Sequence, residues 1–133
     1  MAGNLSFREL ADSASIIMSL NSPWLEHVAS GRKIYEGRRR TEKINEIRPG
    51  NIISFLPVTS SPNDKSIDCK VIAIHSFDTF RDALETLPID RVLPGVRSVD
   101  EGVSIYARFV SIPTQIRDGV VMIQLELCTT TSS

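Results

Sequence analysis

Short apolar runs separated by turn residues dominate the hydrophobic pattern of the chain. Four of these runs have the length and the β-branched and aromatic content of buried strands. They span residues 15–20, 51–58, 67–77 and 120–128. A fifth and more polar segment, residues 34–40, alternates in a way that also suits a strand. Turns are predicted at Pro49-Gly50 and at Asp118-Gly119, directly before two of the strands.

Two segments carry the boundary signals of helices. In the first, Ser22 is placed to cap a helix, Pro23 suits its first position and Gly31 is placed to end it. In the second, residues 80–87, apolar positions recur at i, i+3, i+4 and i+7, Asp78 or Thr79 provides the cap, and Pro88 ends the segment.

A third short helix is predicted around Tyr106, which gives the order β-α-β-β-β-α-(α)-β. This order lacks the regular βα alternation of a doubly wound parallel sheet. It predicts an α+β fold in which a mixed sheet curls into a small β-barrel, with two or three short helices packed outside. We expect one domain over residues 14–128, an N-terminal tail over 1–13 and a C-terminal tail over 129–133.

Composition narrows the class of protein. The 133 residues are 41% hydrophobic and 23% charged with a net charge of −1, as expected for a folded domain. No apolar run approaches the roughly 20 residues of a membrane helix. Cys69 and Cys128 lie in apolar runs and are expected to be free thiols. The sequence has neither metal-ligand spacing nor a phosphate-binding glycine loop, so we expect neither a metal nor a cofactor. Free thiols and the lack of a signal peptide favour an intracellular protein, cytoplasmic or nuclear.

The charge distribution is less even than the total. Residues 32–48 hold seven basic and three acidic side chains, within a chain that is slightly acidic overall. This segment overlaps the stretch SGRKIYEGRRR, residues 30–40. Such a local positive patch favours a local anionic partner over binding of nucleic acid by the whole surface.

Alternation along the strand at 34–40 divides this basic stretch. Glu36, Arg38 and Arg40 share one face, while Gly37 leaves a gap on the other. The turn at the end of the preceding helix can re-aim Lys33 toward Glu36. A glycine within a strand often marks close approach by a ligand or another chain segment. The alternative is a solvated edge strand whose charges prevent edge-to-edge pairing.

Further basic and aromatic side chains are candidates for contacts outside this cluster. The basic candidates for phosphate contacts are Arg39, Arg40, Lys43 and Arg48. The aromatic candidates for stacking on a base are Trp24, Tyr35 and Tyr106. For Trp24 a core role on the helix face is the stronger interpretation.

The chain resembles the ASCH domain family of the PUA-like superfamily. Gly31, Lys33, Glu36 and Arg38 match the start of the family pattern, and the Pro-Gly-Asn turn and strand of IRPGNIISF match its continuation. The segments VIAIHSFDTFRDALETLP and EGVSIYARFVSI…GVVMIQLEL are similar to its later parts. In order, these matches cover roughly residues 15–127.

This resemblance implies a PUA-like β-barrel in which the motif lines a cleft. ASCH domains are proposed to bind RNA, and some members hydrolyse the amide of N4-acetylcytidine or cleave RNA. In the amidohydrolase type a threonine stands at the place of Glu36.

Three hypotheses follow. In the first, the domain binds RNA, a nucleotide or a modified nucleoside through Lys33 and Arg38, oriented by Glu36 and assisted by Arg40 and Tyr106. In the second, it is a small hydrolase of a modified nucleoside or of RNA, with Lys33 and Glu36 as catalytic candidates. In the third, it is a protein-interaction domain in which Glu36 and Arg38 form a structural ion pair.

Overall fold

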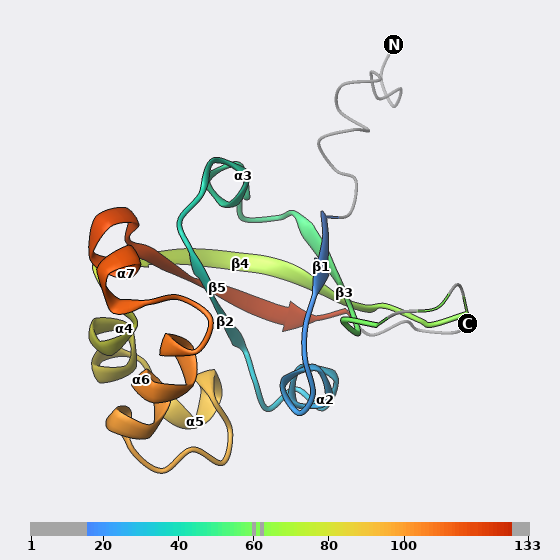
Figure 1. Cartoon of the computed structure of the whole chain (residues 1–133). Coiled ribbons are helices and arrows are strands. Elements are labelled where there is room, and N and C mark those ends of the chain that lie inside the picture. Colours follow the sequence, from blue (N-terminus) through green and yellow to red (C-terminus); the bar gives the residue numbers. More distant parts are fainter. Residues whose placement is uncertain (1–15, 60, 62, 129–133) are drawn as a thin grey trace.

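The computed structural model describes residues 16–59, 61 and 63–128. Its centre is a single five-stranded sheet in the order β1-β3-β4-β5-β2 (Figure 1). The strands are β1 (Ile16–Ser19), β2 (Tyr35–Arg39), β3 (Ile52–Leu56), β4 (Ile67–Phe77) and β5 (Val120–Leu127). β1 runs parallel to β3, and every other neighbouring pair is antiparallel. All five strands lie where the hydrophobic pattern predicts them, so the mixed sheet of the predicted α+β fold is confirmed.

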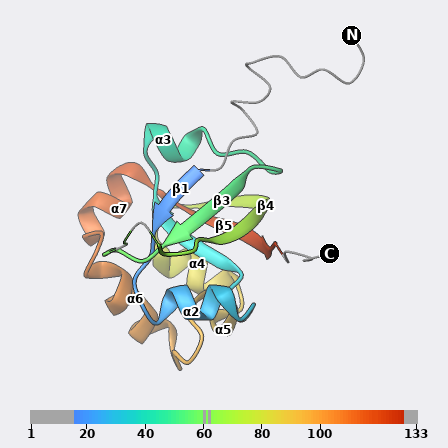
Figure 2. The same ribbon diagram turned by 90° about the vertical axis from the view of Figure 1, so that its right-hand side faces the viewer.

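The sheet curls into a half-barrel. β1 and β2 are its two edge strands, and the curl brings them to the same open side (Figures 1 and 2). A register shift between Val71 and Ala73 interrupts the long β4–β5 ladder. Such an irregularity bends a strand and increases its twist, which helps the sheet to curl.

The described residues form six helices, against the two or three expected. They are α2 (Trp24–Ala29), α3 (Glu42–Asn45), α4 (Phe80–Thr86), α5 (Ile89–Val92), α6 (Val99–Ala107) and α7 (Ile112–Asp118). The additional helices are short, but two have clear caps. The Thr41 hydroxyl accepts a hydrogen bond from the Ile44 N–H, and the Ser111 hydroxyl accepts one from the Thr114 N–H. Such capping residues are the sequence signals by which short helices can be recognised.

The predicted boundaries of α2 and α4 are partly confirmed. Thr79 caps α4, and Gly31 lies just after α2 with a φ of +80°. Ser22 does not cap α2, because its hydroxyl donates to the Glu26 carboxylate instead, at 2.7 Å. The expected tails, residues 1–13 and 129–133, lie outside the described residues.

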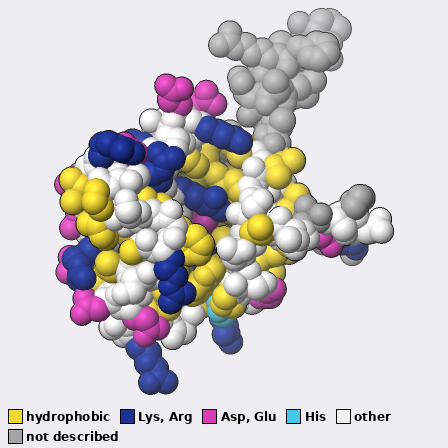
Figure 3. Space-filling model, in the orientation of Figure 1, with side chains coloured by type: hydrophobic (Ala, Val, Ile, Leu, Met, Phe, Trp, Pro, Cys, Tyr) yellow, Lys and Arg dark blue, Asp and Glu magenta, His cyan; other side chains and the backbone are white. Residues whose placement is uncertain are grey.

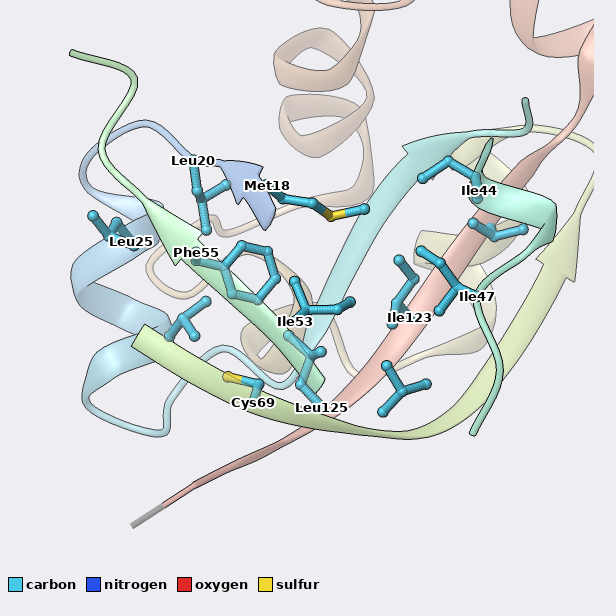
Figure 4. Close-up of a cluster of buried hydrophobic side chains, with 13 residues drawn as sticks. Met18, Leu20, Leu25, Ile44, Ile47, Ile53, Phe55, Cys69, Ile123 and Leu125 are labelled. Atoms are coloured by element: carbon cyan, nitrogen blue, oxygen red, sulfur yellow. The ribbon is translucent and has the colours of Figure 1, made fainter. Parts of the chain in front are cut away.

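β5 separates two hydrophobic cores. Val121, Ile123 and Leu125 belong to the core inside the half-barrel, which β1, β3, α2 and α3 complete (Figure 4). Val120 and Met122 point to the opposite face and pack against α4, α5 and α6. This strict alternation is what a strand buried on both faces requires.

Candidate functional site

A cleft of about 590 Å³ opens on the side of the half-barrel between β1 and β2 and extends to α6. Figure 3 shows this hollow, with basic and acidic side chains at its floor and apolar side chains around it. The charged residues of its lining are Lys33, Glu36, Arg38, Arg39 and Lys43. The aromatic residues of its lining are Trp24, Phe80, Tyr106 and Phe109.

Lys33 is the most deeply buried of these charges, with 2% of the residue exposed. Its Nζ donates to the carbonyls of Tyr35 and Val92, both at 2.6 Å, and lies 3.3 Å from Glu36 Oε1. Backbone carbonyls therefore engage two of the three N–H donors of the ammonium, and the Glu36 carboxylate pairs with its charge. Burial lowers the pKa of Lys33, while the neighbouring Glu36 carboxylate acts in the opposite direction.

Glu36 lies between two cations. It is 5% exposed, and its second carboxylate oxygen, Oε2, accepts from Arg38 Nε at 2.7 Å. The strand alternation places Glu36 and Arg38 on one face of β2, as predicted, and the long side chains meet there. Because one oxygen faces Lys33 and the other faces Arg38, the carboxylate fixes the positions of both cations.

Arg38 also spans the opening of the half-barrel. Its Nη2 donates to the backbone carbonyl of Ser19 on β1 at 2.8 Å, and 30% of its side chain is exposed. A guanidinium carries five N–H donors, and two of them are used in these bonds. The remaining donors have no partner among the residues that the structure describes. Arg38 is therefore a fixed cation with unused hydrogen-bonding capacity in the cleft.

Tyr106 closes the inner end of the cleft. Its ring stacks on Phe80 with 4.0 Å between centroids, and its buried hydroxyl has no hydrogen-bond partner in the described part of the chain. Burial, and secondarily the charge of Glu36, raise its pKa well above the usual range. A Cβ added at Gly37 would lie 2.7 Å from this hydroxyl, so the glycine of β2 permits the close approach of α6.

The cleft thus brings together Lys33, Glu36, Arg38 and Tyr106. The prediction that Arg40 shares their face is wrong, because β2 ends at Arg39 and the alternation stops there. Arg40 Nη1 donates to Asn45 Oδ1 at 3.1 Å, and its side chain lines a separate hollow.

The other basic candidates also divide between the cleft and the surrounding structure. Arg39 and Lys43 line the cleft, although Arg39 also pairs with Asp118 at 3.0 Å. Arg48 donates to the backbone carbonyls of Asn45 and Ile47, which ties it to the chain after α3.

Several residues of the site were not singled out by sequence reasoning. Ile17, Val58 and Phe109 line the cleft and are 64%, 57% and 63% exposed. An apolar residue gives no sequence signal for such exposure, since the same residues are typical of a core. Trp24 packs against both cores, as expected, but it also lines the cleft, and Lys33 Nζ lies 5.9 Å from its ring centroid.

The structure also bears on metals and membranes within the described ranges. No three His, Cys, Asp or Glu side chains lie close enough together there to hold a metal ion. No helix described here has the length and apolar character needed to cross a membrane.

The curled mixed sheet, the helices outside it and the cleft at its opening define a PUA-like domain. The family model of the ASCH domain matches residues 18–128, and the chain belongs to this family. The expectation drawn from the motif around Lys33 and Arg38 is therefore confirmed at the level of the family.

Solved structures agree with this assignment. The crystal structure of hypothetical protein PH0355 has a TM-score of 0.76 and 34% identity, covering 86% of this chain and 100% of that one. The solution NMR structure of protein PF0455 from Pyrococcus furiosus has a TM-score of 0.69 and 34% identity, covering 86% and 97%. A variant of ZmASCH from Zymomonas mobilis has a TM-score of 0.57 and 16% identity, covering 86% and 69%, which bears on the fold alone. No curated protein matches the chain.

Proposed function

We propose that this ASCH domain binds RNA or a nucleotide in the cleft between β1 and β2, and that Arg38 is the charged group that meets the ligand. One observation carries the proposal. Arg38 is held by Glu36 and by the Ser19 carbonyl, yet three of its five N–H donors have no partner in the described structure. A fixed guanidinium with unused donors is well suited to phosphate or to the carbonyl edge of a base.

Lys33, Glu36 and Arg38 have different roles in this proposal. The Lys33 ammonium and both Glu36 oxygens are engaged with each other, with Arg38 or with backbone carbonyls. They therefore hold Arg38 and the floor of the cleft in place. What the floor offers to a ligand is N–H donors from Arg38, close to the buried hydroxyl of Tyr106, which has no partner in the described structure. The ligand must then present acceptor oxygens or nitrogens.

The walls suit the apolar part of a nucleotide. A volume of about 590 Å³ is in the range of small-molecule sites. Trp24 and Phe109 offer aromatic surface for the faces of a base. Lys43 and Arg39 add positive charge to the lining, which favours phosphate and makes binding sensitive to salt.

Fluorescence anisotropy with a 5′-fluorescein single-stranded RNA of twelve nucleotides tests the proposal. We expect binding that weakens with salt and falls at least about tenfold in Arg38→Ala, since a charge-assisted contact contributes about 1.5–3 kcal/mol. Arg81→Ala is the matched control, because Arg81 pairs with the exposed Asp100 and lies outside the cleft. An equal loss of RNA affinity in Arg38→Ala and Arg81→Ala, or no RNA binding by the natural protein, would reject the proposal. Unlabelled UMP, AMP and N4-acetylcytidine as competitors distinguish the ligand classes.

A second candidate function, hydrolysis of a modified nucleoside or of RNA, is favoured by one observation. Burial lowers the pKa of Lys33, as a general base requires. Against it, Lys33 is almost inaccessible, and its Nζ donates to two backbone carbonyls and pairs with the Glu36 carboxylate. Mass spectrometry after incubation with N4-acetylcytidine or RNA decides the matter. Turnover that disappears in Glu36→Gln would support hydrolysis, and an unchanged substrate would exclude it for these compounds.

A further inference from the structure

We propose that the ligand of the cleft is a single-stranded RNA segment of two or more nucleotides. The second nucleotide lies in a groove beside α6, with its base against Phe109 and its phosphate near Arg108. This inference rests on the function proposed above and extends it from a one-nucleotide site to a strand.

The groove is contiguous with the cleft. It has a volume of about 830 Å³ and lies between the β1–α2 turn, the chain after β3 and the outer side of α6. The two hollows share lining residues on all of these sides, namely Leu20, Asn21, Trp24, Val58, Ile105 and Phe109. A ligand that fills the cleft can therefore continue into the groove along a common wall.

Phe109 marks the junction. It is the residue after Arg108, the C-cap of α6; its side chain lines both hollows, and the residue is 63% exposed. Leaving an aromatic ring in water forgoes the free energy of its burial. A base stacked on the ring would recover part of this, and Val58, which is 57% exposed, extends the same apolar surface.

Arg108 supplies the charge. It lines the groove but not the cleft, it is exposed, and its guanidinium has no partner among the residues described. Glu101 is the acidic residue of the same groove, so the charge there is balanced and the electrostatic attraction is local to Arg108. Arg108 is the C-cap of α6. The helix dipole stabilises a positive charge at this end of a helix, whether or not a ligand is bound.

An unpaired strand fits these features better than the alternatives. In a duplex the bases stack on each other and their faces are not available to Phe109. A protein segment would use the apolar wall, but it would have no need of the donor-lined cleft that continues from it. Single-stranded RNA uses both, through acceptor groups in the cleft and a base face in the groove.

A ladder of unlabelled oligouridylates and oligoadenylates, from one to four nucleotides, tests the inference by competition with the labelled twelve-nucleotide RNA. We expect affinity to rise at least about tenfold from one nucleotide to three, because stacking of one base contributes about 1–3 kcal/mol. Phe109→Ala reduces this ratio by about the same factor. Arg108→Gln lowers the salt slope for the three-nucleotide ligand by about 0.7, the value for one contact to a single strand.

Ile116→Ala is the matched control, because Ile116 is 68% exposed and lies on α7 outside both hollows. Ile116→Ala should have the same ratio of trinucleotide affinity to mononucleotide affinity as the natural protein. If mononucleotides bind but affinity does not rise with length, or if Phe109→Ala keeps the natural ratio, the groove is not an RNA site and the proposed function stands alone. If no RNA of any length binds, both proposals fall.

Discussion

Arg38 reaches from one edge strand of the sheet to the other and donates to the backbone carbonyl of Ser19 at 2.8 Å. β1 and β2 are not neighbours in the hydrogen-bonded order of the sheet, so this bond crosses the open side of the half-barrel. The same guanidinium is anchored to Glu36 at its Nε. Arg38 is thus a structural link between the strands as well as the candidate contact to a ligand.

Replacing Arg38 should therefore reduce stability as well as binding. For Arg38→Ala we expect a loss of about 1–2 kcal/mol in the free energy of unfolding, since a partly exposed ion pair and one hydrogen bond disappear. Arg38→Lys keeps the charge but replaces the planar fork that meets Glu36 and Ser19, so its stability should be intermediate. Urea denaturation measures both.

Arg39→Ala is the control for this prediction. Arg39 is the next residue of β2, but 42% of its side chain is exposed in its pair with Asp118. An exposed pair contributes about 0–1 kcal/mol, so Arg39→Ala should be nearly neutral. Equal midpoints for the Arg38 and Arg39 variants would show that the link across the opening does not stabilise the half-barrel.

Glu36→Gln should be the most damaging single change in the cluster. It leaves the Lys33 ammonium buried without its carboxylate, and breaking a buried pair in this way costs about 3–5 kcal/mol. The deficit should shrink as the pH rises. Because burial lowers the pKa of Lys33 below 10.5, the unfolded chain binds more protons between the folded and the ordinary value, and stability increases with pH in that window. The carboxylate raises this pKa, so its removal widens the window.

Urea denaturation of the natural protein and Glu36→Gln at pH 7 and pH 9 measures this effect. Taking the difference in the free energy of unfolding between the two proteins cancels the pH-dependent contributions of titratable groups that both contain. The control adds Glu36→Gln to a protein that already carries Lys33→Met. Neither member of this pair has an ammonium to titrate at position 33, so the deficit between them should not depend on pH. A pH-independent deficit in Glu36→Gln itself would show that the Lys33 charge is not the cause.

The local sequence pattern was sufficient to predict the strands and, within the site, the pairing of Glu36 with Arg38. The alternation of β2 alone places Glu36 and Arg38 on one face, and the ion pair that forms there spans two residues. The same rule failed for Arg40 because a strand end depends on where pairing stops, and β2 pairs with β5 only as far as Arg39. The alternation of residues in the sequence does not indicate where the pairing of two strands ends.

The rest of the site depends on contacts between distant segments. The Val92 carbonyl that accepts from Lys33 is 59 residues away, and the Ser19 carbonyl that accepts from Arg38 is 19 residues away. Backbone carbonyls exist at every position, so no residue type signals which of them will be used. The buried Gln115 is a similar case, because it accepts from the Phe80 N–H and donates to the Val110 carbonyl only once α4 and α7 have packed.

Gly37→Ala tests the close approach of α6 to β2. The added Cβ would lie 2.7 Å from the Tyr106 hydroxyl and 2.8 Å from Phe80 Cε1, where a stacked pair leaves little freedom to move. We expect a loss of about 1–3 kcal/mol in the free energy of unfolding from overpacking, measured by urea denaturation. Adding Tyr106→Phe should restore part of it, since it removes the shortest of three close contacts and leaves those with Phe80 Cε1 and Tyr106 Cζ.

Gly31→Ala is the comparison for this substitution, because Gly31 has a φ of +80° but nothing near its missing Cβ. It should lose about 1–2 kcal/mol through backbone strain alone and should not respond to Tyr106→Phe. A loss in Gly37→Ala that Tyr106→Phe leaves unchanged would mean that the hydroxyl does not contribute to the crowding.

Tyr106→Phe separates a role in binding from a role in folding. The hydroxyl is buried without a partner in the described structure, so its removal should leave stability unchanged or raise it by about 1 kcal/mol. The raised pKa adds a pH signature. Above pH 10 an unfolded tyrosine loses its proton while the folded one keeps it, so stability falls as pH rises, and Tyr106→Phe should flatten this fall.

If the hydroxyl serves the ligand, the same substitution should weaken binding. We expect RNA affinity to drop about fivefold to tenfold, because one hydrogen bond contributes about 1 kcal/mol or slightly more. Tyr35→Phe, at the other tyrosine of the chain, lies outside the cleft lining and is the control. A more stable protein that binds RNA less tightly is the combination that a purely structural tyrosine cannot produce. Unchanged affinity would remove Tyr106 from the site and leave Arg38 as its polar contact.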